Sequence, residues 1–280
     1  MKKLIAWVLV GFVGLSSVGE AGARAEEKSV RGTISVGGWE RSYRLYVPPG
    51  VTGRAPLVVA LHGGLNDGAY LERQSGLDGL AERERAVVVY PDGILGTYNA
   101  GTCCAFARIL GIDDVGFLDA LIARLDADGV ADGRQVFLTG FSNGAALAYR
   151  YACERASRVA AVAVVSGALG VGCEPVRPVP VLAFHGTADF SVPYDGGGNM
   201  DGDVKIPFPP VRWLMDFWRW KNGGLPDLGW ATDIGDWTWC QSSSRDVIEV
   251  QFCTILNGGH EWPVRATDRI AGFFRAHPPR

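Results

Sequence analysis

Hydrophobic and polar positions divide most of the chain into short apolar runs and longer amphipathic stretches. The apolar runs are bounded by glycine and proline and cover residues 56–61, 86–90, 136–139, 159–165 and 179–184. Wholly apolar runs of this length are typical of central strands in a parallel sheet that is covered on both faces. Residues 43–47 and 247–255 instead alternate between apolar and polar positions, which also predicts strands.

Amphipathic stretches with helical spacing separate these strands, at residues 67–84, 113–127 and 145–155. The stretch 113–127 begins with an acidic pair, and either Asp113 or Asp114 can cap a helix there. We prefer this role for the pair over a metal site. Because strands and helices alternate, the sequence predicts an α/β fold with a mostly parallel central sheet and helices on both faces.

The N-terminus has the order of features found in a secretory signal. Lys2 and Lys3 precede an apolar stretch over residues 4–18, and the small residues Ala23 and Ala25 follow it. We expect cleavage after Ala25, because the stretch is shorter than the about 20 apolar residues that span a bilayer. The sequence therefore predicts a signal peptide at 1–25, one catalytic domain at 26–280, a secreted or periplasmic location, and no stable membrane insertion.

Charge and cysteine content narrow the classes of partner. The 280-residue chain has a formal net charge of -3, with no long run of either sign, so a nucleic-acid partner is not expected.

The six cysteines of the chain follow the predicted cleavage site, and an even count in an exported chain favours disulfides over metal ligation. We expect no metal site, and pair only Cys153 with Cys173, which follow a predicted helix and the strand after it.

Glycine, proline and aromatic residues dominate residues 194–246, where a helix is predicted at 210–221. Six of the nine tryptophans lie here: Trp213, Trp218, Trp220, Trp230, Trp237 and Trp239. They form either part of the core or a substrate groove, and the sequence leaves both possibilities open.

Residues 140–144 match the pattern G-x-S-x-G around Ser142. The pattern alone is weak, but a predicted strand precedes it and a predicted helix follows it. This is the setting of a nucleophile elbow, in which glycines allow a sharp turn that exposes the serine hydroxyl. We therefore predict Ser142 as a catalytic nucleophile.

A serine nucleophile needs a base, and the base needs an acid that fixes its tautomer. His260 lies between the last predicted strand and the final helix, and Asp189 directly follows the predicted strand 179–184. The order Ser142, Asp189, His260 is that of α/β-hydrolases. Three other aspartates compete less well for the acid role: Asp195, Asp201 and Asp203. His185 is interpreted as a structural residue of the Asp189 loop.

An oxyanion intermediate needs backbone donors. The amide of Asn143, next to the nucleophile, is one candidate, and that of Gly64 in the sequence Leu-His-Gly-Gly after an early strand is the other. The alternative is that the two glycines only form a tight turn.

These motifs, taken together and in order, resemble the poly(3-hydroxybutyrate) depolymerase and feruloyl esterase family. The matching blocks are residues 61–64, 99–101, 103–104, 113–118, 140–144, 185–189, 192–194 and 259–263. The resemblance runs from about residue 41 to residue 263. It implies an exported α/β-hydrolase that needs no metal or organic cofactor and acts on polymer-linked esters. Tyr98 stands where the family commonly has tryptophan, and Gly224 stands where a cysteine is expected, so the partner of Cys240 stays open.

The sequence therefore predicts an exported serine carboxylic-ester hydrolase that acts through an acyl-enzyme. Its substrates would be feruloyl or acetyl esters of polysaccharides, or 3-hydroxybutyrate oligomers from a polyester. We expect Tyr98 and Trp262 to contact the substrate. The alternatives are a serine peptidase of related fold and a non-catalytic secreted polymer-binding protein.

Overall fold

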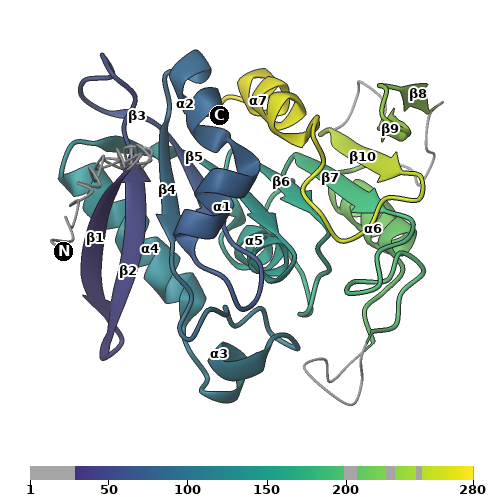
Figure 1. The fold of residues 1–280 in the computed structure, drawn as a ribbon, viewed down its shortest axis with the longest axis horizontal. Helices are drawn as coiled ribbons and strands as arrows, with labels where there is room; N and C mark the ends of the chain where they lie inside the picture. The colour runs from purple at the N-terminus through teal and green to yellow at the C-terminus, as the bar shows by residue number, and fades with distance from the viewer. Residues whose placement is uncertain (1–28, 199–206, 225–230, 244–247, 280) are drawn as a thin grey trace, which may run out of the picture.

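The computed structural model describes residues 29–198, 207–224, 231–243 and 248–279, and the predicted signal peptide at 1–25 lies outside this part. The described residues form one ten-stranded sheet, in the order β1-β2-β4-β3-β5-β6-β7-β10-β9-β8 (Figure 1). The strands are β1 (Val30–Val36), β2 (Trp39–Tyr46), β3 (Ala55–Leu61), β4 (Val87–Pro91), β5 (Ala131–Phe141), β6 (Ala161–Val165), β7 (Val181–Gly186), β8 (Thr232–Asp233), β9 (Thr238–Ser242) and β10 (Val250–Ile255).

Six neighbouring strands of the sheet are parallel, in the order β4-β3-β5-β6-β7-β10. Antiparallel strands lie at both edges, β1 and β2 at one and β9 and β8 at the other. Helices α1 (Gly68–Ser75), α2 (Leu77–Glu84) and α7 (Ala266–Ala276) pack on one face through one apolar cluster. Helices α4 (Asp114–Ala127), α5 (Asn143–Glu154) and α6 (Val211–Lys221) pack on the other through a second cluster. The short helix α3 (Ala105–Ile109) lies beyond one end of the sheet, and a 3₁₀ turn, η1 (Ala156–Arg158), follows α5. The predicted α/β class is confirmed.

The stretch 67–84, predicted as one helix, is two helices. Asp67 caps α1 by accepting a hydrogen bond from the Tyr70 amide at 2.8 Å, and Gly76 ends it with φ +62°. A left-handed residue cannot continue a right-handed helix, and glycine adopts this conformation without steric cost. The apolar spacing continues across Gly76, which is why the pattern alone did not separate α1 from α2.

The two acidic residues at the start of α4 have different roles. Asp113 is exposed and caps the helix, because its side chain accepts a hydrogen bond from the Gly116 amide at 2.8 Å. Asp114 is fully buried instead, with Oδ1 2.6 Å from the guanidinium of buried Arg41 and Oδ2 accepting the Asn99 amide at 2.6 Å. Asp114 therefore ties β2 to the loop before α3.

Three disulfides link cysteines of the described residues. Cys153–Cys173 connects the end of α5 to the segment before β7, as predicted. Cys240–Cys253 joins paired positions of β9 and β10, which gives Cys240 the partner that the sequence left open. The third disulfide joins the neighbours Cys103 and Cys104.

The tryptophans do not share one role. Trp218 is fully buried under the sheet, whereas Trp213, Trp220 and Trp237 are more than half exposed, and Trp230 lies outside the described residues. The core interpretation therefore holds for Trp218. Among the described residues, no helix combines the length and apolar character needed to cross a bilayer.

Removing the carboxylate of Asp114 should destabilise the fold far more than removing that of Asp113. Asp114→Ala leaves the Arg41 charge buried without its partner, a change that costs about 3–5 kcal/mol. Asp113→Ala removes one helix cap, which costs about 1 kcal/mol. The two free energies of unfolding can be compared by urea denaturation, and equal losses would contradict the described roles.

Candidate active site

Ser142 occupies the one-residue turn between β5 and α5. Its φ of +53° and ψ of -116° are strained values for a residue with a side chain. A methyl group at Gly144 would overlap the carbonyl oxygens of Leu61 and His62, and one at Gly140 would overlap the backbone of Gly144. Both glycines of the motif are therefore required by close backbone contacts. The Ser142 amide donates to the Val165 carbonyl at 2.9 Å, which fixes the turn against β6.

Asp189 and His260 follow β7 and β10, two adjacent parallel strands, and meet beyond their carboxyl ends. The Nδ1 atom of His260 lies 2.8 Å from Oδ2 of Asp189. The imidazole also packs against the ring of Phe141, with 4.7 Å between ring centroids. Since Phe141 directly precedes Ser142, this contact holds the predicted base beside the predicted nucleophile.

The Asp189 carboxylate is buried but well supplied with donors. Its Oδ1 accepts hydrogen bonds from the amides of Ser191 and Val192, each at 2.9 Å. Burial by itself raises the pKa of Asp189, but the hydrogen bonds from His260 and from the Val192 amide outweigh it, so the pKa lies below its usual value. Asp189 is therefore a carboxylate acceptor near neutral pH, as the tautomer-fixing role needs.

His185 contacts both Asp189 and the loop residue Val192 that donates to it. Its Nε2 lies 2.7 Å from the Val192 carbonyl and 3.5 Å from Oδ2 of Asp189. Burial lowers the pKa of His185, and the neutral ring can donate its Nε2 proton to the carbonyl. These contacts agree with the structural role predicted for His185. Of the competing aspartates, Asp195 is exposed, and Asp201 and Asp203 lie outside the described residues.

The two predicted oxyanion donors are neighbours. Asn143 is the first residue of α5, where backbone N–H groups lack an intrahelical partner, and an ideal Cβ on Gly64 would lie 3.8 Å from the Asn143 Cβ. The Asn143 side chain is held by Tyr98, accepting its amide at 2.7 Å and donating to its carbonyl at 2.9 Å. The helix N-terminus favours negative charge at this point.

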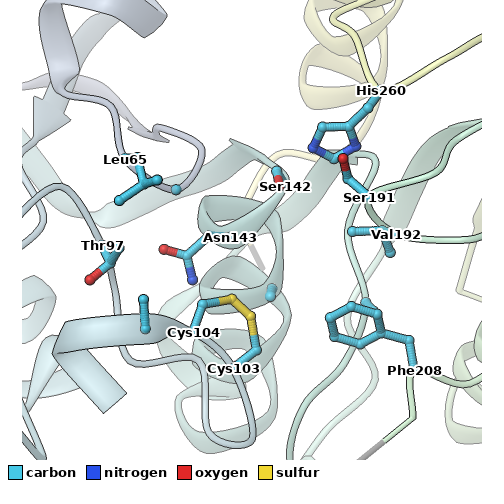
Figure 2. A pocket seen from close by; sticks show the side chains of 14 residues that line it. Leu65, Thr97, Cys103, Cys104, Ser142, Asn143, Ser191, Val192, Phe208 and His260 are labelled. Atoms are coloured by element: carbon cyan, nitrogen blue, oxygen red, sulfur yellow. A yellow bond between two sulfur atoms is a disulfide. The ribbon is translucent and has the colours of Figure 1, made fainter. Parts of the chain in front are cut away.

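A pocket of about 320 Å³ brings the predicted site together (Figure 2). Gly64, Asn143, Ser142 and His260 all line it, with Asp189 behind the imidazole. The rest of its wall is Leu65, Thr97, Cys103, Cys104, Ala105, Ala146, Ala168, Ser191, Val192 and Phe208.

The two predicted substrate contacts lie elsewhere. Tyr98 is fully buried, and its hydroxyl donates to the Pro91 carbonyl at 2.7 Å. The indole of Trp262 donates to the Thr267 hydroxyl at 3.0 Å and packs against the apolar cluster under α7. Neither side chain lines the pocket, so the structure gives Tyr98 a positioning role toward Asn143 and gives Trp262 a packing role.

Sequence reasoning missed several residues of this site. The amides of Ser191 and Val192, which hold Asp189, leave no side-chain signal in a sequence. Phe208 and Leu65 reach the pocket from loops whose path the pattern does not predict. The adjacent residues Cys103 and Cys104 can be read from the sequence, but the sequence does not show that their loop folds against the pocket. Among the described residues, no cluster of three or more His, Cys, Asp or Glu could hold a metal ion.

The chain is similar to known esterases. The family model described as Esterase PHB depolymerase matches residues 41–178. A probable feruloyl esterase C from Aspergillus terreus is 32% identical over 210 residues, which cover 71% of this chain and 73% of that protein. The putative esterase NocK from Nocardia uniformis subsp. tsuyamanensis is 32% identical over 271 residues, covering 84% and 77%.

A solved acetyl xylan esterase from Aspergillus awamori has a similar fold, with a TM-score of 0.63 at 15% identity over 87% of this chain and 99% of that one. A bifunctional acetylxylan esterase/xylanase from Neocallimastix patriciarum is 32% identical over 150 residues, which are 53% of this chain and 21% of that protein.

The lowered pKa of Asp189 predicts how acid affects stability. The stabilisation from this carboxylate is fully present above the unfolded pKa of about 3.9, and is lost as pH falls through the lower folded pKa. The free energy of unfolding of the wild type should therefore fall more steeply below about pH 4 than that of Asp189→Asn. Urea denaturation at a series of pH values measures both. The exposed Asp195→Asn serves as control, and a wild-type curve parallel to that of Asp189→Asn would refute the prediction.

Proposed function

The chain belongs to the Esterase PHB depolymerase family of carboxylic ester hydrolases, and we propose that it is an exported serine esterase that acts through an acyl-enzyme on Ser142. One observation gives this mechanism its main support. The strained Ser142 opens onto the same pocket as His260, and Asp189 holds the far nitrogen of that imidazole at 2.8 Å.

In the first step the Ser142 Oγ attacks the ester carbonyl while Nε2 of His260 removes its proton. Nδ1 is engaged with Asp189, so it carries the other proton and Nε2 has the free lone pair that a base needs. The Asp189 carboxylate stabilises the imidazolium that forms. His260 then gives the proton to the leaving alcohol oxygen, which departs as a neutral alcohol.

The negative charge of the tetrahedral intermediate is received by the amides of Gly64 and Asn143. One such donor contributes about 2.7–4 kcal/mol to transition-state stabilisation in a known serine hydrolase. The paired hydrogen bonds between the Asn143 side chain and Tyr98 keep the first turn of α5 in position. In the second step water, activated by His260, hydrolyses the acyl-enzyme and releases Ser142.

The names of relatives support the substrate class that we propose. Two of the sequence relatives described above are named as esterases of feruloyl or acetylxylan groups, so esters borne by polysaccharides or their oligomers are the favoured substrates, with 3-hydroxybutyrate oligomers as the polyester alternative. The ester-hydrolase names of these relatives favour an esterase over a peptidase or a non-catalytic polymer-binding protein.

Export is supported by two independent features of the chain. Residues 1–25 have the composition of a secretory signal, and six cysteines form three disulfides, which persist in oxidising compartments. A secreted or periplasmic location fits both.

The mature chain should hydrolyse members of a panel of p-nitrophenyl acyl esters, methyl ferulate and 3-hydroxybutyrate oligomers. Ser142→Ala should lower kcat by roughly 10⁴-fold or more, because the nucleophile is lost. The ester with the highest kcat/KM identifies the substrate class. Hydrolysis that survives in Ser142→Ala would refute the mechanism.

Asp189→Asn tests the acid separately. It should lower kcat by roughly 10⁴-fold, since the amide favours the wrong imidazole tautomer. The exposed Asp195→Asn is the matched control and should keep wild-type kcat. An equal loss in the two variants would argue against Asp189 as the acid.

A further inference from the structure

A second groove lies beside the catalytic pocket, and the side chain of Phe208 lines both. The groove has a volume of about 480 Å³, which is within the range of small-molecule sites. Neither Ser142 nor His260 lines it. In Figure 2, Phe208 lies at the side of the catalytic pocket away from His260. The groove is therefore next to the catalytic centre but is not part of it.

Trp213 in α6 gives this groove a flat and exposed aromatic face. Its indole is 55% exposed and stacks on Phe217, one turn later in the helix, with 5.9 Å between the ring centroids and 16° between the ring planes. The ammonium of Lys221 lies 5.6 Å from the centre of the Phe217 ring. Trp220 and Trp237 are also exposed, but neither lines the groove or the catalytic pocket. Among these three exposed indoles, that of Trp213 is thus the one held at a cavity.

The two walls of the groove are held by hydrogen bonds within the protein. One wall is the loop 169–174 after β6, where the Gly170 carbonyl accepts the Thr102 amide at 2.8 Å and a disulfide ties the loop to α5. On the other wall, the backbone of Phe208 pairs with that of Gly197 through hydrogen bonds of 2.6 and 2.9 Å. The groove exists before a ligand binds, so binding costs little ordering free energy.

Polar groups accompany the apolar surface of the groove. Thr102 contributes a hydroxyl, and Glu174 contributes a carboxylate that is paired with the Lys221 ammonium. Because this pair is neutral as a whole, the groove does not favour a charged polymer of either sign. A sugar ring has an apolar face of C–H groups and hydroxyls around its edge. An exposed indole beside hydrogen-bonding side chains matches both parts of such a ring.

From these observations, and resting on the proposed function, we propose that the groove is a glycan-binding site in which Trp213 stacks on a sugar ring of a neutral polysaccharide. This sugar is not the one that carries the cleaved ester, because the leaving oxygen must lie beside His260. A chain bound on Trp213 keeps its other esters near Ser142, which raises their effective concentration at the catalytic pocket. An aliphatic polyester matches the groove less well, since it has no ring of hydroxyls for Thr102 and Glu174.

Binding of a glycan without an ester tests the site independently of catalysis. The probe is xylohexaose, a neutral oligosaccharide, titrated into the mature chain by isothermal titration calorimetry. Trp213→Ala should weaken binding about tenfold or more, because an anchoring tryptophan contributes a large share of the binding free energy. Trp213→Phe keeps a smaller aromatic face and should recover part of the affinity. The matched control is Trp237→Ala, which removes an indole that is 74% exposed and should change the Kd by less than about twofold.

Hydrolysis of a polymer and of a small ester shows whether the site serves the catalytic pocket. The ratio of kcat/KM on acetylated xylan to kcat/KM on p-nitrophenyl acetate should fall about tenfold in Trp213→Ala, since only the polymer can use both sites at once. The same ratio should be unchanged in Trp237→Ala.

The proposal is overturned if the parent does not bind xylohexaose, if Trp213→Ala binds it as tightly as the parent, or if Trp237→Ala weakens binding equally. Adsorption of the parent to poly(3-hydroxybutyrate) granules that is lost in Trp213→Ala, without oligosaccharide binding, would also overturn it and assign the groove to a polyester. Failure of the proposed function is distinguishable, because p-nitrophenyl acetate hydrolysis would then be absent or would survive in Ser142→Ala. The xylohexaose titration reports on the groove in either case.

Discussion

The close approach of α5 to the end of β3 is the constraint on which the site depends. Gly144 in the first turn of α5 faces the carbonyls of Leu61 and His62, with no room for a side chain between them. This approach forces the strained turn at Ser142, and it also brings the loop after β3 to the N-terminus of α5. The proposed nucleophile and both proposed oxyanion donors therefore arise from one packing contact rather than from separate features.

The proposed base, His260, and the proposed acid, Asp189, are held differently, by hydrogen bonds beyond the ends of neighbouring strands. Asp189 receives two amides from its own loop and one imidazole from the loop after β10, so a buried carboxylate is kept charged without a cationic side chain. On the opposite side, the Arg41–Asp114 pair holds Asn99, and the adjacent Tyr98 holds Asn143. Hydrogen bonds from surrounding loops thus hold both the Asp189–His260 pair and Asn143 in place.

Apolar patterning predicted the central strands and the main helices because those elements are buried on both sides or along one stripe. The edge strands β1, β8 and β9 were missed, since they are short or largely exposed and lack a continuous apolar run. The triad and oxyanion candidates could be proposed because glycine spacing and chain order carry the chemistry of this fold. Tyr98 and Trp262 were predicted as substrate contacts from their loops alone, and a sequence does not say toward which side a loop residue points. For the same reason the Cys103–Cys104 wall could not be predicted.

The most direct test of the account is to identify the residue that carries the acyl group during turnover. The chain would be mixed with p-nitrophenyl acetate, quenched with acid within the first turnover, digested and analysed by mass spectrometry. The account predicts an acetyl group on the peptide that contains Ser142. Turnover without an adduct at Ser142, or with the acetyl group on another residue, would contradict it.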